Sequence, residues 1–128
     1  MRYARLLALS LLFVACRAPE PPLHMVKLPS GRMLKVISVT KVQYAKGSPA
    51  LMLKYQTDLP MTDETALERE AKEIWPNFMI DVEHEKLPNA ILSATSHPTG
   101  VFAPHSTSYN FVLQKGANGL WQRLPPHR

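Results

Sequence analysis

Histidine is the side chain best suited to acid–base or metal chemistry near neutral pH, and this sequence contains five. They are His24, His84, His97, His105 and His127. His97 and His105 lie eight residues apart in one segment, and His84 stands between two glutamates. A zinc site needs three or four ligands that converge on one point, and neither spacing matches a known zinc pattern. We therefore expect solvated surface histidines, no metal site and no cofactor.

Nucleophilic catalysis has equally little support in the sequence. No serine lies in a Gly-x-Ser-x-Gly context. Ser106 or Ser108 beside His105 would need a distant acid to complete a triad. The neighbouring carboxylates Asp63 and Glu64 belong to an acidic segment that is typical of a solvated helix face. We predict no catalytic residues and expect that the protein is not an enzyme.

The only cysteine, Cys16, ends a segment laid out like a bacterial secretory signal peptide. Arg2 and Arg5 precede the ten-residue, largely apolar run Leu6–Ala15. A helix that spans a bilayer needs roughly 20 residues, so we expect no permanent transmembrane helix here. Residues 1–15 are therefore predicted to be a signal peptide.

The last four residues of this segment, FVAC, resemble the lipobox of bacterial lipoproteins, in which a small residue precedes the cysteine that becomes lipidated. That motif usually begins with Leu, and Phe13 takes this position here. The resemblance implies that Cys16 becomes the acylated N-terminus and anchors the chain to a lipid bilayer; three acyl chains hold far more firmly than one. Because Arg17 and not Asp follows Cys16, the enterobacterial sorting rule implies the outer membrane, with the domain facing the periplasm. The alternative is an ordinary secretory signal that is cleaved near an idle cysteine.

The charge of the chain falls once the signal peptide is removed. The formal net charge of the whole chain is +5, and without Arg2 and Arg5 it is +3. Nine of the ten acidic residues lie between Asp58 and Glu85, and basic residues dominate both flanks. No basic run with interleaved aromatic residues occurs, so we do not expect nucleic-acid binding.

The segment that follows Cys16 is rich in proline. Residues 16–32 contain Pro19, Pro21, Pro22 and Pro29, and we predict a tether without regular secondary structure. We place a single folded domain at 33–124 and a short tail at 125–128.

Strand and helix patterns alternate in this domain. β-Branched and alternating apolar residues predict strands at 33–44, 50–57, 90–95, 108–115 and 120–124, with a loop of little structure at His97–Thr107. Between the second and third strands the apolar period becomes that of a helix. Its stripe is Leu67, Ala71, Ile74, Phe78 and Val82. We expect Thr62 as the N-cap, the i,i+4 pairs Glu68–Lys72 and Arg69–Glu73, and a kink at Pro76.

The order β-β-α-β-β-β predicts an α+β fold, in which an antiparallel sheet of about five strands has one long kinked helix packed on one face. The segments ALMLKYQT, ALEREAKEIWPNF, AILSATS and SYNFVLQK together resemble a group of small exported bacterial proteins of unknown function. This resemblance covers residues 34–124. It supports the architecture and export, and it implies no catalytic residues.

The most plausible binding residues are an aromatic side chain and the long loop. Trp75 lies one position off the apolar stripe, where it either covers the edge of the core or lines a groove. Loops on a small rigid scaffold commonly carry recognition, which adds His97 and His105 to the candidate binding surface.

We expect a non-catalytic lipoprotein of the bacterial cell envelope whose domain binds an envelope protein or supports an assembly. The alternative is a small hydrolase or metal-dependent enzyme that uses the His97–Thr107 loop. Convergence of His84, His97 and His105 within ligand distance would favour this alternative.

Overall fold

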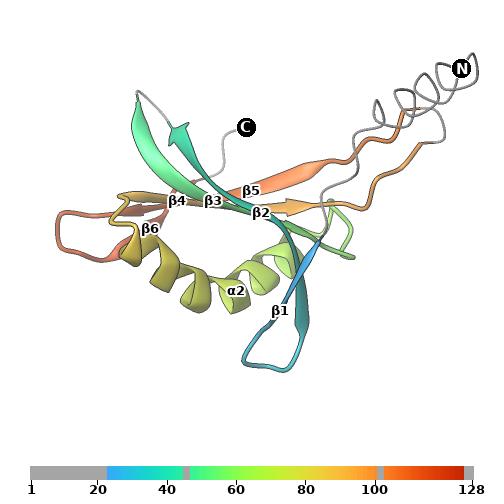
Figure 1. The fold of residues 1–128 in the computed structure, drawn as a ribbon, viewed down its shortest axis with the longest axis horizontal. Helices are drawn as coiled ribbons and strands as arrows, with labels where there is room; N and C mark the ends of the chain where they lie inside the picture. The colour runs from blue at the N-terminus through green and yellow to red at the C-terminus, as the bar shows by residue number, and fades with distance from the viewer. Residues whose placement is uncertain (1–22, 45–46, 101–102, 126–128) are drawn as a thin grey trace, which may run out of the picture.

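A computed structural model of the chain describes residues 23–44, 47–100 and 103–125. The described residues form an α+β fold in which one long helix crosses one face of a six-stranded sheet (Figure 1). The elements are β1 (His24–Lys27), β2 (Met33–Tyr44), β3 (Ser48–Gln56), α2 (Glu64–His84), β4 (Asn89–Thr95), β5 (Ser108–Lys115) and β6 (Trp121–Arg123). The predicted α+β class is confirmed, and the strands from β2 onwards lie close to their predicted positions.

The sheet is mixed, whereas the sequence led us to expect an antiparallel one. Its strand order is β1-β2-β3-β4-β5-β6, and every neighbouring pair is antiparallel except β3 and β4. Those two strands run parallel because α2 carries the chain back along the sheet before β4 begins. A helical crossover is the usual connection between parallel strands.

The sixth strand, β1, lies inside the predicted tether, so the folded unit begins before Met33. Residues His24–Lys27 pair antiparallel with Met33–Val36. The turn that follows closes through a hydrogen bond from the Leu28 amide to the Arg32 carbonyl, 2.8 Å long. The Leu28 side chain is 3% exposed and belongs to the hydrophobic core. Proline at 29 fits because it occupies the turn and not the strand.

Helix α2 runs without interruption from Glu64 to His84, with Pro76 inside it. All five residues of the predicted stripe are buried. The N-cap is Asp63 and not Thr62, since the Asp63 carboxylate accepts a hydrogen bond from the Ala66 amide at 3.1 Å. An Asp side chain satisfies an N-terminal amide in the same way as Thr.

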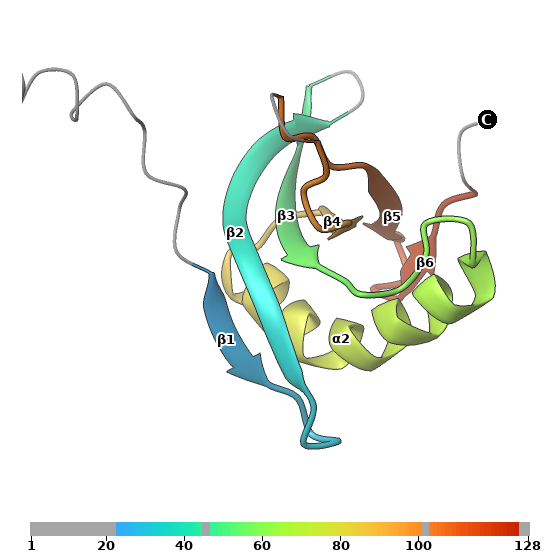
Figure 2. The same ribbon diagram turned by 90° about the vertical axis from the view of Figure 1, so that its right-hand side faces the viewer.

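The core lies between α2 and one face of the sheet. That face presents alternate residues of each strand, among them Leu53, Tyr55, Leu92 and Phe111. Seen from the side, β1 and β2 form one edge of the sheet, next to α2 (Figure 2). Strand β2 is longer than β1 and pairs with it only over residues 33–36.

The segment His97–Thr107 has more structure than expected. Thr99 and His105 form an antiparallel bridge with two hydrogen bonds of 2.8 Å, and the Ser96 amide donates to the Thr107 carbonyl at 2.9 Å. Gly100 has φ +109°, and a Cβ there would lie 2.8 Å from the Ala103 carbonyl oxygen, so this turn requires glycine. The arms of the predicted loop therefore extend the β4–β5 ladder.

Candidate functional site

A groove lies between the β1–β2 edge of the sheet and α2. Its volume is about 600 Å³. Apolar side chains line it from three strands and from the helix, and they include Val26, Leu28, Leu34, Val36, Val39, Leu53, Ile74 and Phe78. Val26 is 42% exposed and Val39 is 49% exposed, although both belong to the groove wall. The size and the apolar lining are typical of ligand and peptide sites.

Two sets of ion pairs join this edge of the sheet to the helix: one links the β1–β2 turn to α2, and the other links β2 to the C-cap of α2. Arg32 pairs with Glu70 and lies 3.8 Å from the Glu73 carboxylate. At the C-cap, the Lys41 ammonium lies 2.8 Å from the Glu85 carboxylate. The Lys41 pair holds the pKa of Glu85 below its usual value. A smaller hollow of about 280 Å³ shares Val39 with the groove and continues it towards Lys41.

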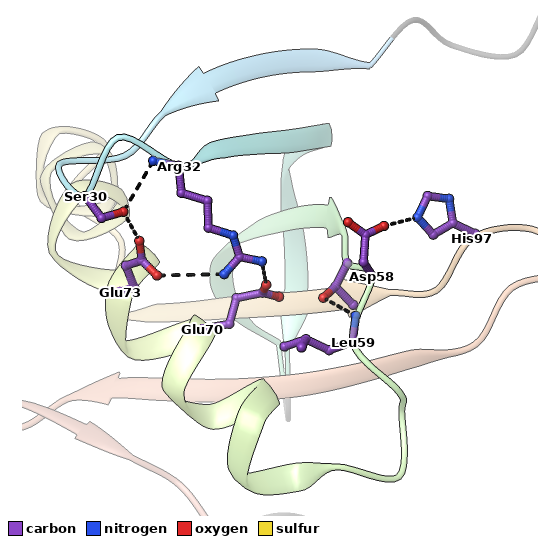
Figure 3. A network of polar contacts seen from close by, with 8 residues as sticks. Ser30, Arg32, Asp58, Leu59, Glu70, Glu73 and His97 are labelled. Atoms are coloured by element: carbon purple, nitrogen blue, oxygen red, sulfur yellow. Dashed lines mark hydrogen bonds and ion pairs between the residues drawn. The ribbon is translucent and has the colours of Figure 1, made fainter.

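The Arg32 pairs belong to a polar cluster that joins the β1–β2 turn to the helix (Figure 3). Ser30 donates a hydrogen bond to Glu73, and Arg32 donates one to Glu70. The Glu70 side chain is only 2% exposed, whereas that of Arg32 is 47% exposed. Burying a carboxylate costs free energy unless a charged partner compensates it. The positive charge of Arg32 therefore offsets the cost of burying Glu70.

Tyr55 lies next to this cluster and is fully buried. Its hydroxyl and the Glu70 Oε1 atom have no hydrogen-bond partner among the described residues. Burial raises the pKa of Tyr55 well above its usual value, the negative charge of Glu70 adds to this, and Arg32 opposes it. Tyr55 therefore stays neutral over the physiological pH range.

His97 forms a pair with Asp58, which lies beyond the end of β3 (Figure 3). The hydrogen bond from His97 is the main reason that the pKa of Asp58 is lowered, with the nearby Lys35 charge adding to it. Both side chains are exposed. Within the described ranges, no hydroxyl group makes a hydrogen bond to the His97 ring, so the pair has the acid and base of a triad without its nucleophile.

The other histidines take separate positions. The His105 ring lies 3.4 Å from the Ala103 carbonyl oxygen, and His84 ends α2. In the part of the chain that the structure describes, no three His, Cys, Asp or Glu side chains are grouped closely enough to hold a metal ion. His127 lies outside the described residues.

Trp75 packs at the edge of the core on the side of the helix that faces β6. Its ring lies 5.2 Å from Trp121 and 6.2 Å from Phe78, each in an edge-to-face arrangement. The Trp121 indole donates to Glu83 at 2.8 Å. A hydrogen bond from Lys115 is the main reason that the pKa of Glu83 is lowered, and the Trp121 bond adds to it. A hollow of about 270 Å³ lies between the two tryptophans and Arg123. Trp75 thus covers the core, and a binding role for this smaller hollow stays a prediction.

The three predicted binding residues have separate partners in the described ranges: Trp75 packs against Trp121 of β6, His97 pairs with Asp58, and the His105 ring lies near the Ala103 carbonyl. Cys16, the signal peptide and residues 16–22 of the predicted tether lie outside the described residues. None of the helices in the described ranges is both long and apolar enough to cross a membrane.

The groove was not predicted from the sequence because its outer wall, β1, was assigned to the tether. A signal for that strand is present in the alternation of His24, Val26 and Leu28, which all line the groove. Comparison with models of known protein families, with curated proteins and with solved structures finds no match for this chain.

Proposed function

We propose that this chain is a non-catalytic lipoprotein of the bacterial cell envelope, anchored through Cys16, whose α+β domain binds another envelope protein. The observation that carries the binding role is the groove beside α2. Its wall exposes Val26 and Val39 to solvent, and an exposed apolar hollow on a small domain is typical of an interaction site. The lipid anchor rests on the FVAC motif alone.

The hydrolase alternative rests on the Asp58–His97 pair. A His97→Ala variant that loses a hydrolytic activity of the purified protein, while its thermal midpoint is unchanged, would favour this alternative over the binding role.

Lipidation of Cys16 is the first testable prediction. Replacing Cys16 with Ser removes the thiol that would carry the acyl chains, so cells that express this variant should incorporate no labelled palmitate into the protein. The parent protein should be labelled and should fractionate with the outer membrane. Absence of label from the parent would contradict the anchor.

The binding role is tested by crosslinking in intact cells, followed by identification of the captured protein by mass spectrometry. A photoreactive amino acid is placed in turn at Val39, Trp75 and His97. Ile80 is the control position, because it is exposed on α2 and lines neither the groove nor the hollow between the two tryptophans. We expect one envelope protein to be captured from at least one of the three positions and not from Ile80. Capture from none of them, or equally from all four, would contradict the proposed role.

A further inference from the structure

The groove has an open strand edge along one side. β1 pairs only with Met33–Val36, whereas β2 continues to Tyr44. In the described ranges, no strand pairs with the outer edge of β2 over residues 37–44. Eight residues of strand extend about 26 Å, which is long enough for a short peptide to form a ladder.

We propose that this edge binds an extended peptide segment of a partner protein, which adds to the sheet as a strand in line with β1. This inference rests on the proposed binding role and names the chemistry of the partner. Strand addition supplies main-chain hydrogen bonds for affinity, and alternate side chains enter the adjoining groove for specificity.

β1 already shows how a strand sits on this edge. Its alternate residues His24 and Val26 line the groove, as does Leu28 directly after it, whereas Met25 and Lys27 do not. Further along β2, Val39 lines the same groove with half of its surface exposed, because no strand stands beside it in the described residues. The partner segment should therefore alternate apolar residues with polar ones.

The charges along the groove specify one further residue of the partner. Asp81 on α2 lines both the groove and its continuation, is exposed, and has no ion-pair partner among the described residues. Lys41 and Glu85 are already paired with each other. A basic side chain at a groove-facing position of the partner would complement Asp81.

The segment of this chain just before β1 is a poor occupant. It contains Pro19, Pro21 and Pro22, and proline has no amide hydrogen to donate to a ladder. A strand from another molecule is free of this restriction.

The experiment measures binding of synthetic peptides to the full-length protein in detergent by fluorescence anisotropy. The probe is a labelled octapeptide in which valine and threonine alternate and one valine is replaced by lysine. Val39→Asn should weaken binding at least tenfold, and Thr40→Asn, the matched change on the other face of β2, should change it less than twofold. The parent protein should bind this lysine peptide more tightly than the analogue that keeps valine at the lysine position. Asp81→Asn should abolish this preference.

Backbone methylation separates strand addition from simple apolar contact. Only alternate residues of an added strand direct their amides towards its neighbour. Of two probes methylated on alternate amides, one should lose binding and the other should retain it. Equal binding of both, or no binding of the parent probe, would overturn the proposal.

Two further outcomes would assign the edge to a different occupant and also overturn the proposal. Self-association that Val39→Asn abolishes would show that a second copy occupies it, and probe binding only after deletion of residues 17–22 would show that the chain's own segment does. Failure of the peptides together with partner capture from Trp75 or His97 would remove this inference and leave the proposed function standing.

Discussion

Glu70 is the residue whose environment differs most from what its type suggests. It lies in a helix with acidic residues on its wet face, yet its side chain is 2% exposed. The predicted pair Glu68–Lys72 is found, at 3.7 Å, whereas Glu73 contacts Ser30 and Arg32 instead of the predicted Arg69. Sequence spacing finds pairs within one helix. It cannot find Arg32 for Glu70, because these residues are 38 positions apart and meet only through the β1–β2 turn.

Removing the charge of Arg32 should destabilise the fold, because Glu70 would stay buried without compensation. We expect Arg32→Met to lower the free energy of unfolding by about 2 kcal/mol, less than for a fully buried pair because Arg32 is half-exposed. The double variant Arg32→Met/Glu70→Leu should recover most of this loss, since replacing both partners with apolar residues is often neutral. Urea denaturation measures both variants. A double variant less stable than Arg32→Met would contradict this account of the pair.

The raised pKa of Tyr55 predicts a loss of stability in alkali. In the folded protein Tyr55 stays neutral, whereas in the unfolded chain it ionises near its ordinary pKa of 10.0, so the unfolded state binds fewer protons above that pH. The contribution of Tyr55 is therefore complete below pH 10 and declines as the pH rises further. Tyr55→Phe should flatten this decline in the urea midpoint, and Tyr109→Phe, at a half-buried position, should not. Parallel curves for the parent and Tyr55→Phe would contradict the prediction.

Among the elements, α2 was the easiest to predict and β1 the hardest. The helix has five apolar residues at helical spacing, and burial of all five confirms the predicted face. β1 has only four residues, and prolines lie close on both sides of it, so local composition favours a tether. The alternation of its residues is a weak strand signal, and the local sequence does not specify the pairing with β2 that completes the strand. The parallel pairing of β3 with β4 was also missed, since the order of the elements does not state which strands become neighbours.

Phe78 tests the packing of α2 on the sheet. Its side chain is 3% exposed, so Phe78→Ala should lower the free energy of unfolding by about 3 to 5 kcal/mol. The matched control is Ile80→Ala on the same helix, at a residue that is 64% exposed, where we expect a change of less than about 0.5 kcal/mol. Thermal or urea denaturation compares the two. Similar effects at both positions would show that the helix face is wrongly assigned.

For the whole molecule, the corrected start of the domain has a measurable consequence. A chain that begins at Met33 lacks β1, the buried Leu28 and the Arg32 ion pair. Compared with a chain that begins at Leu23, it should be less stable by about 3 kcal/mol or more, since loss of a buried leucine side chain alone costs about 2 to 5 kcal/mol. Equal urea midpoints for the two chains would show that residues 23–32 do not stabilise the fold and that the domain begins at Met33.

The order of the strands in the sheet is also their order along the chain. When the chain becomes available for folding from its N-terminus, each strand can therefore pair with the strand that precedes it in the sequence. Only the pairing of β4 with β3 must wait until the intervening helix α2 is also available. When contacts are local in sequence, the loops that must close are short. The entropic cost of reaching the folding transition state is then lower. We expect refolding from urea to be fast for a protein with six strands, with β3, α2 and β4 forming the slowest step.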